Sequence, residues 1–85
     1  MLEAIGRVIG RSRALILARL ESPTSTTELA ALTDLTPGGV SQHLTAMHDA
    51  GLVAAHRVGR VVLYSRTAIA EALVAEGNFS KDWRR

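Results

Sequence analysis

Two helix boundaries, a short distance apart, constrain the fold of this chain more than any other feature of its sequence. Thr36 followed by Pro37 is typical of a helix start, because the threonine can cap free amides and the proline has none to satisfy. Gly51 followed by Leu52 is typical of a helix end, since glycine readily adopts the left-handed conformation that closes a helix. Together they predict a helix over residues 37–50.

A second capping pattern lies just upstream of this helix. Ser25-Thr26-Thr27-Glu28 has the spacing of a capping box, in which the serine and the glutamate satisfy free amides reciprocally. A short helix follows, and residues 33–35 leave room only for a tight turn. A short helix, a tight turn and a longer capped helix predict a helix-turn-helix over residues 26–50.

Helices are also predicted on both sides of this unit. Apolar residues at helical spacing predict a short amphipathic helix over residues 2–10, and a second helix that Ser12 caps and Pro23 ends. Gly10 either separates these two helices or lies within one bent helix. A last helix is capped by Thr67 and ends at Gly77.

After Leu52 the sequence period changes from helical to extended. Residues 53–57 and 61–65 read as two short strands around Val58-Gly59, which predicts a hairpin. We therefore expect a mainly α fold with a small β-hairpin, a winged helix-turn-helix whose wing spans residues 53–66. The domain occupies residues 1–77, followed by a C-terminal tail over 78–85.

Composition excludes several classes of protein. The 85 residues suffice for one domain, and without cysteine the chain has neither disulfides nor thiolate metal sites. We find no apolar run long enough to span a membrane and no secretory signal, so we expect a cytoplasmic protein with no membrane partner. The net charge is only +2, and all of this excess falls within residues 36–66 together with the three histidines. A local positive region suits a polyanion, although such a charge is common on any surface.

The predicted longer helix has one apolar and one polar side. Its apolar side belongs to a core that supports the helix, for which we predict Leu35, Val40, Leu44, Met47, Leu52 and Tyr64. The polar side is small and nearly uncharged near the start of the helix, which suits entry into the DNA major groove. We predict DNA contacts from Thr36, Gly38, Gly39, Ser41, Gln42, His43 and Thr45.

Individual residues suggest individual roles at this surface. Gln42 can both donate to and accept from adenine, and hydroxyl side chains can reach base edges or phosphates. Two glycines in a first turn weaken a helix, so Gly38 and Gly39 either allow a close approach to DNA or are tolerated in a frayed turn. Arg57 and Arg60 flank the hairpin tip and are placed for contacts to the DNA backbone or the minor groove.

Metal-site and enzyme signatures are absent from the sequence. His43 and His48 project from well-separated sides of one helix, so they cannot share a metal ion there, and we expect no metal and no cofactor. There is no phosphate loop, nucleophile elbow or nucleophilic cysteine, so we expect no enzyme.

The motifs together resemble the arsenic-repressor (ArsR) type of winged-helix transcriptional regulators. The resemblance covers residues 11–76 and is carried by Arg11-Ser12-Arg13-Ala14 with Ile16-Leu17, Val40-Ser41-Gln42-His43-Leu44, Met47, Ala50-Gly51-Leu52-Val53, Arg57-Val58-Gly59-Arg60 and Tyr64. It implies a homodimer that binds a pseudo-palindromic operator in double-stranded DNA, usually as a repressor. By position, it implies that Ser41, Gln42 and Thr45 read bases or phosphates, that His43 supports the helix, and that the wing arginines hold the backbone.

The sequence departs from the metal-sensing members of that family. Thr26 and Thr27 stand where those members carry paired cysteines, and the last helix has neither Asp nor His. The resemblance also extends to C-terminal domains of longer regulators, in which a separate part does the sensing. The residues do not identify an effector, and they leave one alternative function open, a winged-helix module for protein association without DNA readout.

Overall fold

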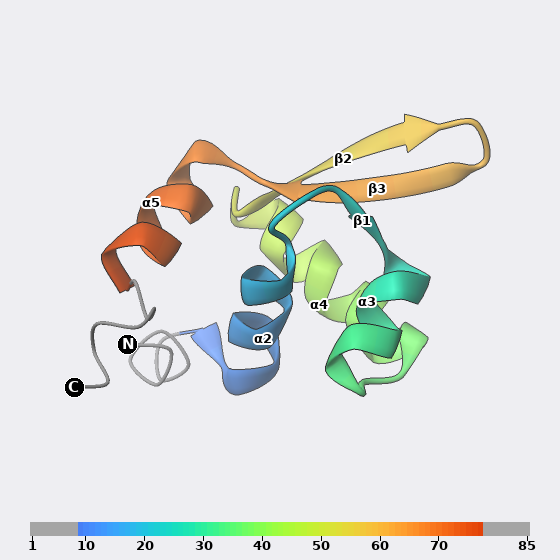
Figure 1. Cartoon of the computed structure of the whole chain (residues 1–85), viewed down its shortest axis with the longest axis horizontal. Coiled ribbons are helices and arrows are strands. Elements are labelled where there is room, and N and C mark those ends of the chain that lie inside the picture. Colours follow the sequence, from blue (N-terminus) through green and yellow to red (C-terminus); the bar gives the residue numbers. More distant parts are fainter. Residues whose placement is uncertain (1–8, 78–85) are drawn as a thin grey trace.

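A mainly helical arrangement surrounds a small antiparallel sheet in the computed structural model, which describes residues 9–77 (Figure 1). This confirms the predicted winged helix-turn-helix. The elements in chain order are α2 (Arg11–Arg19), β1 (Thr24–Ser25), α3 (Thr26–Thr33), α4 (Pro37–Asp49), β2 (Val53–Val58), β3 (Val61–Arg66) and α5 (Ala68–Gly77). The predicted helix over residues 2–10 and the tail over 78–85 fall almost entirely outside the described residues.

The start and the end of α2 differ from their predicted positions. Gly10, with a φ of 99°, interrupts the helix between Ile9 and Arg11, so Ser12 lies inside the first turn and the prediction that it caps the helix is wrong. The helix ends at Arg19, several residues before Pro23, where the buried Leu20 turns the chain. Because glycine readily adopts a positive φ, Gly10 redirects the backbone without a side-chain cap. The helix α2 therefore starts at Arg11, earlier than a cap at Ser12 would place it.

The helix-turn-helix forms where the capping patterns predict it. The Ser25 side chain accepts a hydrogen bond from the Glu28 amide, and Glu28 reaches back to the Ser25 amide, as in a capping box. Asp34, with a φ of 66°, turns the chain between α3 and α4. At the start of α4, the Thr36 hydroxyl accepts a hydrogen bond of 3.0 Å from the Gly39 amide.

The end of α4 closes in the predicted way. Gly51 has a φ of 78°, and the Leu52 amide donates to the Met47 carbonyl at 2.8 Å. The Gly51 amide donates to the His48 carbonyl at 3.0 Å. This pair of bonds is the Schellman motif, which leaves the chain directed into the first strand of the wing.

The three strands form one sheet in the order β1-β3-β2. Val58 pairs with Val61, so the hairpin turn consists of Gly59 and Arg60, one residue later than the predicted Val58-Gly59 turn. The turn lies at these residues because Gly59 has a φ of 64°, which suits the first position of a two-residue turn. The two-residue strand β1 was not predicted; it extends the sheet by pairing Thr24 with Tyr64.

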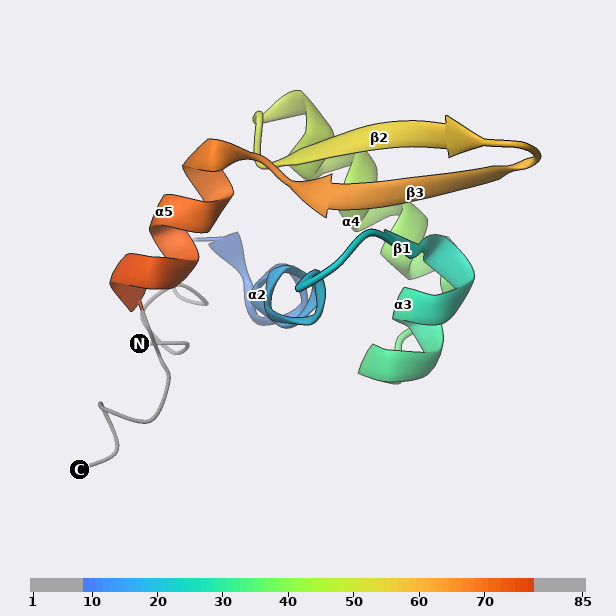
Figure 2. The same cartoon turned by 45° about the horizontal axis from the view of Figure 1, so that its top comes forward.

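The core lies between the helices and the inner face of the sheet. Its buried members are Ala14, Ile16, Leu17, Leu20, Leu29, Ala30, Val40, Leu44, Met47, Val53 and Ala70. Thr67 links the start of α5 to the turn that follows α4. Its hydroxyl donates to the Gly51 carbonyl at 2.7 Å and accepts from the Ala70 amide at 3.3 Å. Figures 1 and 2 show β2 and β3 projecting together beyond this body as a wing, while α5 lies at the other end. Within residues 9–77, no helix has the length and apolar character needed to cross a bilayer.

Candidate nucleic-acid interface

The helix α4 separates its residues into a buried side and an exposed side. Val40, Leu44 and Met47 are buried in the core. Ser41, Gln42 and Thr45 are exposed, as is Gly38 near the start of the helix. The predicted DNA-reading residues of the helix body therefore share an accessible surface, and the apolar side anchors that surface to the rest of the domain.

The remaining predicted core residues support α4 from its ends and from the wing. Leu35, Leu52 and Tyr64 are partly buried and pack against the core cluster that contains the apolar side of α4. Leu35 precedes the helix cap and Leu52 follows the helix end, so the two boundaries of α4 are held by packing as well as by hydrogen bonds.

The two glycines of the first turn have different surroundings. A Cβ atom added at Gly38 would meet nothing within 4 Å, so this residue leaves an open surface at the start of α4. A Cβ atom added at Gly39 would lie 3.0 Å from the Thr36 hydroxyl oxygen, the atom that caps the helix. The space around Gly39 thus gives a reason for glycine within the protein itself, whereas the surroundings of Gly38 do not.

His43 connects α4 to α2, the first helix of the described residues. Its Nδ1 atom accepts a hydrogen bond of 3.1 Å from Nε of Arg13. This partly buried bond holds α4 against α2, and the sequence pattern did not indicate Arg13 as the partner of His43.

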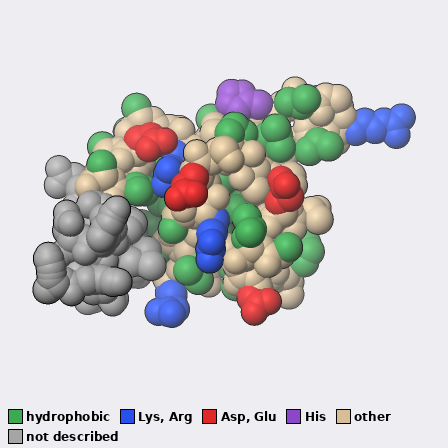
Figure 3. Space-filling view, viewed as in Figure 1, with side chains coloured by type: hydrophobic (Ala, Val, Ile, Leu, Met, Phe, Trp, Pro, Cys, Tyr) green, Lys and Arg blue, Asp and Glu red, His purple; other side chains and the backbone are tan. Residues whose placement is uncertain are grey.

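The wing presents both predicted arginines to solvent. Arg57 lies on β2 and Arg60 lies in the turn itself, and both are exposed. Figure 3 shows a basic side chain at the free end of the hairpin, beyond a group of apolar ones. Val58 and Val61, on either side of the turn, are 58% and 48% exposed, so the tip combines charge with accessible apolar surface.

Arg66 does not belong to this surface, although it contributes to the positive charge of residues 36–66. Its side chain is only 9% exposed and its Nη1 atom donates to the Leu17 carbonyl at 3.1 Å. Its Nε atom lies 3.5 Å from a carboxylate oxygen of Glu71. The guanidinium therefore stabilises the carboxyl end of α2, where a cation is favourable, and ties β3 to α2 and α5.

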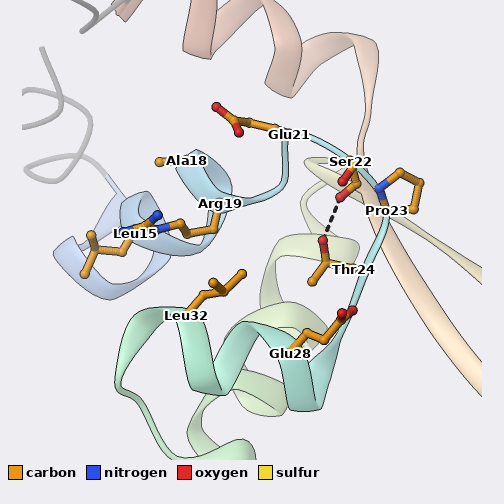
Figure 4. Close-up of a pocket in the computed structure, with 9 residues that line it drawn as sticks. All are labelled: Leu15, Ala18, Arg19, Glu21, Ser22, Pro23, Thr24, Glu28 and Leu32. Atoms are coloured by element: carbon orange, nitrogen blue, oxygen red, sulfur yellow. Dashed lines mark hydrogen bonds between the residues drawn. The ribbon is translucent and has the colours of Figure 1, made fainter.

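A groove between the end of α2 and α3 lies apart from α4 and the wing. Its lining residues, drawn in Figure 4, are Leu15, Ala18, Arg19, Glu21, Ser22, Pro23, Thr24, Glu28 and Leu32. The charged groups carry both signs, with two carboxylates and one guanidinium, so this groove does not favour a polyanion. Among residues 9–77, no three His, Cys, Asp or Glu side chains gather as a candidate metal site.

Comparison with known families identifies the helix-turn-helix. The family described as "Bacterial regulatory protein, arsR family" matches residues 12–55, which include α2 from its second residue, all of α3 and α4, and the start of the wing. A search of curated proteins found no match.

Solved structures of regulators share this fold over most of the chain. A predicted DNA-binding transcriptional regulator from E. coli is 30% identical, with a TM-score of 0.71, and the alignment covers 89% of this chain and 84% of that one. Reduced HlyU from Vibrio cholerae is 23% identical with a TM-score of 0.74, covering 89% and 88% of the two chains. A MarR family regulator from Silicibacter pomeroyi is 17% identical with a TM-score of 0.80, covering 89% and 54%. For the last two structures, whose sequences are less than 25% identical to this chain, the similarity is one of fold alone.

Proposed function

The chain belongs to the arsR family of bacterial regulatory proteins, and from that premise we propose that it acts as a dimeric repressor that reads a pseudo-palindromic operator. Family and fold are those of DNA-binding transcriptional regulators. The observation that carries the finer proposal is the exposed polar side of α4 beside a projecting wing with two exposed arginines. A regulator of this kind works on the chromosome, so we place it in the cytoplasm.

In the proposed complex, α4 enters the major groove with its first turns foremost. Gln42 lies opposite the buried side of the helix, where a side chain reaches straight towards base edges. Ser41 and Thr45 lie beside it and contact bases or phosphates. The Thr45 hydroxyl donates to the Ser41 carbonyl at 3.0 Å, so in this geometry it can accept from a base donor, and it must leave this bond in order to donate to a phosphate.

The two glycines and His43 have supporting roles in this proposal. Gly38 keeps the start of α4 free of side-chain bulk, so the backbone approaches the DNA closely. Thr36 and Gly39 maintain the cap that holds the first turn of the helix in shape. His43 keeps α4 in position through Arg13, while Arg57 and Arg60 on the wing contact the DNA backbone.

A second copy of the chain is required to read an operator with two half-sites. One protomer presents one α4, and a recognition helix of this length reads one half-site. Exposed apolar surface on α5 supports association, because Ile69 is 63% exposed and Leu73 is only partly buried. A dimer bound to an operator represses by occupying the DNA that the transcription machinery needs.

Selection of bound duplexes from a random DNA pool, at two salt concentrations, tests the proposal. We expect enrichment of an inverted repeat with half-sites one helical turn apart or multiples of it, and retention that falls steeply as salt rises. If the protein retains duplexes in a salt-sensitive way but no inverted repeat is enriched, the proposal that a dimer reads two half-sites would be refuted. Absence of retention at low salt would refute DNA binding by this surface and favour the protein-association module.

A further inference from the structure

A small notch separates α4 from the wing. It has a volume of about 230 Å³ and is lined by Leu44, Thr45, His48, Ala55 and Tyr64. Two of these residues come from the two strands of the hairpin, and the other three come from the second half of α4. None of the lining residues is acidic.

The register of the hairpin explains why the notch is open. Ala55 on β2 pairs with Tyr64 on β3, so both side chains lie on one face of the hairpin. Val53 lies on the same face and is buried in the core, which shows that this face is directed towards the body of the domain. At Ala55 the wing leaves the core, and the short alanine side chain leaves a space between the strand and α4.

Three of the residues that line this space carry a hydrogen-bonding side chain. Thr45 and His48 are three residues apart on α4, so their side chains lie on the same side of the helix. Tyr64 lines the same space from β3 and is partly buried, and His48 is exposed to solvent. Arg57 lies two residues beyond Ala55 on the same face of β2, which places a positive charge further along the wing.

The two DNA-contacting parts of the domain lie on either side of the notch. If α4 occupies the major groove and the wing follows the neighbouring minor groove, the sugar-phosphate backbone that separates these grooves must pass between them. That backbone is an anion with oxygen acceptors only, and the notch offers hydroxyl and imidazole donors without a carboxylate to repel it.

We propose that the notch between α4 and the wing binds one backbone phosphate of double-stranded DNA, with His48 and Tyr64 as its donors and Thr45 beside them. The inference rests on the proposed function and extends it to two residues outside the predicted reading surface. Phosphate contacts carry no base information but fix the register of a protein on the duplex. The notch therefore aligns the reading helix and the wing on the same DNA strand.

Two conservative variants test this site. Tyr64→Phe removes only the hydroxyl group, and His48→Gln keeps a hydrogen-bond donor but removes the imidazole. His56→Gln is the matched control, because His56 alternates with Ala55 and so lies on the opposite face of the same strand. Affinity is measured by fluorescence anisotropy with two short duplexes of unrelated sequence at low salt, and melting temperatures report the fold.

We expect His48→Gln and Tyr64→Phe each to weaken binding by about three- to tenfold, the effect of losing one hydrogen bond, equally on both duplexes. His56→Gln should bind like the original protein. The proposal is refuted if both test variants retain full affinity, or if either weakens binding to one duplex only, which would indicate base contact. If Tyr64→Phe also lowers the melting temperature, the exposed His48 decides the outcome. Failure of the unmodified protein to bind either duplex would refute the proposed function itself.

Discussion

Replacing Gly38 by alanine should make the protein more stable and its binding to DNA weaker. The glycine occupies the second position of α4, and a Cβ atom there meets nothing within 4 Å, so the new methyl group creates no clash. Alanine restricts the unfolded backbone and favours a helix over glycine by up to about 1 kcal/mol. In a domain of this size that gain corresponds to a rise in melting temperature of about 4–8 °C.

Gly39→Ala is the matched comparison within the same turn. Its Cβ atom would lie 3.0 Å from the Thr36 hydroxyl oxygen, which accepts the Gly39 amide hydrogen bond. The capping side chain must give by a few tenths of an ångström. Complete loss of a cap costs about 1 kcal/mol, so weakening of this one offsets the gain in helix propensity. We therefore expect Gly39→Ala to melt no higher than the original protein and clearly below Gly38→Ala.

The assay combines thermal unfolding by circular dichroism with anisotropy titrations on the duplex enriched from the random pool. If the open surface at Gly38 allows close approach to DNA, the added methyl group should weaken binding about fivefold or more, equivalent to about 1 kcal/mol. Wild-type affinity in a more stable Gly38→Ala protein would refute the role of this surface. A lower melting temperature for Gly38→Ala would refute the stability argument drawn from its surroundings.

Three further substitutions test separate parts of the interface. Gln42→Ala should weaken operator binding by about 1–3 kcal/mol and relax specificity at one base pair, and equal weakening on all sequences would mean that Gln42 contacts only backbone. Arg60→Ala should reduce the slope of log affinity against log salt by about one, measured by titrations over a salt series, and an unchanged slope would place the wing off the phosphates. Arg13→Ala should lower stability by about 1 kcal/mol by removing the hydrogen bond to His43, and a melting temperature equal to that of the original protein would show that the bond contributes nothing.

Features encoded by neighbouring residues could be read from the sequence. The capping box at Ser25 and Glu28, the cap at Thr36 and the closure at Gly51 each involve groups a few positions apart, so their geometry follows from local chemistry. The division of α4 into a buried and an exposed side also follows from helical spacing. These features sufficed to predict the winged helix-turn-helix.

Predictions failed where a neighbouring segment or a stronger local preference decided the outcome. Ser12 has the side chain of a cap, but the left-handed Gly10 starts α2 earlier. The predicted hairpin turn was one residue early, because cross-strand pairing of Val58 with Val61 sets the register. The strand β1 exists only because β3 offers it an edge, and two residues are too few to show a period.

By itself, the sequence determined the boundaries of α4, the start of α3, the order of the helices and the wing, and the residues that α4 exposes, because these depend on the backbone within a few residues. Only the tertiary structure decided which side chains meet across the fold. Arg13 reaches His43 across 30 positions and Arg66 reaches Leu17 across 49, contacts that no local pattern marks. The same holds for the notch, since Tyr64 and His48 approach each other only when the hairpin folds back over α4. Such contacts arise from packing elements distant in the chain, and local backbone preferences carry no information about them.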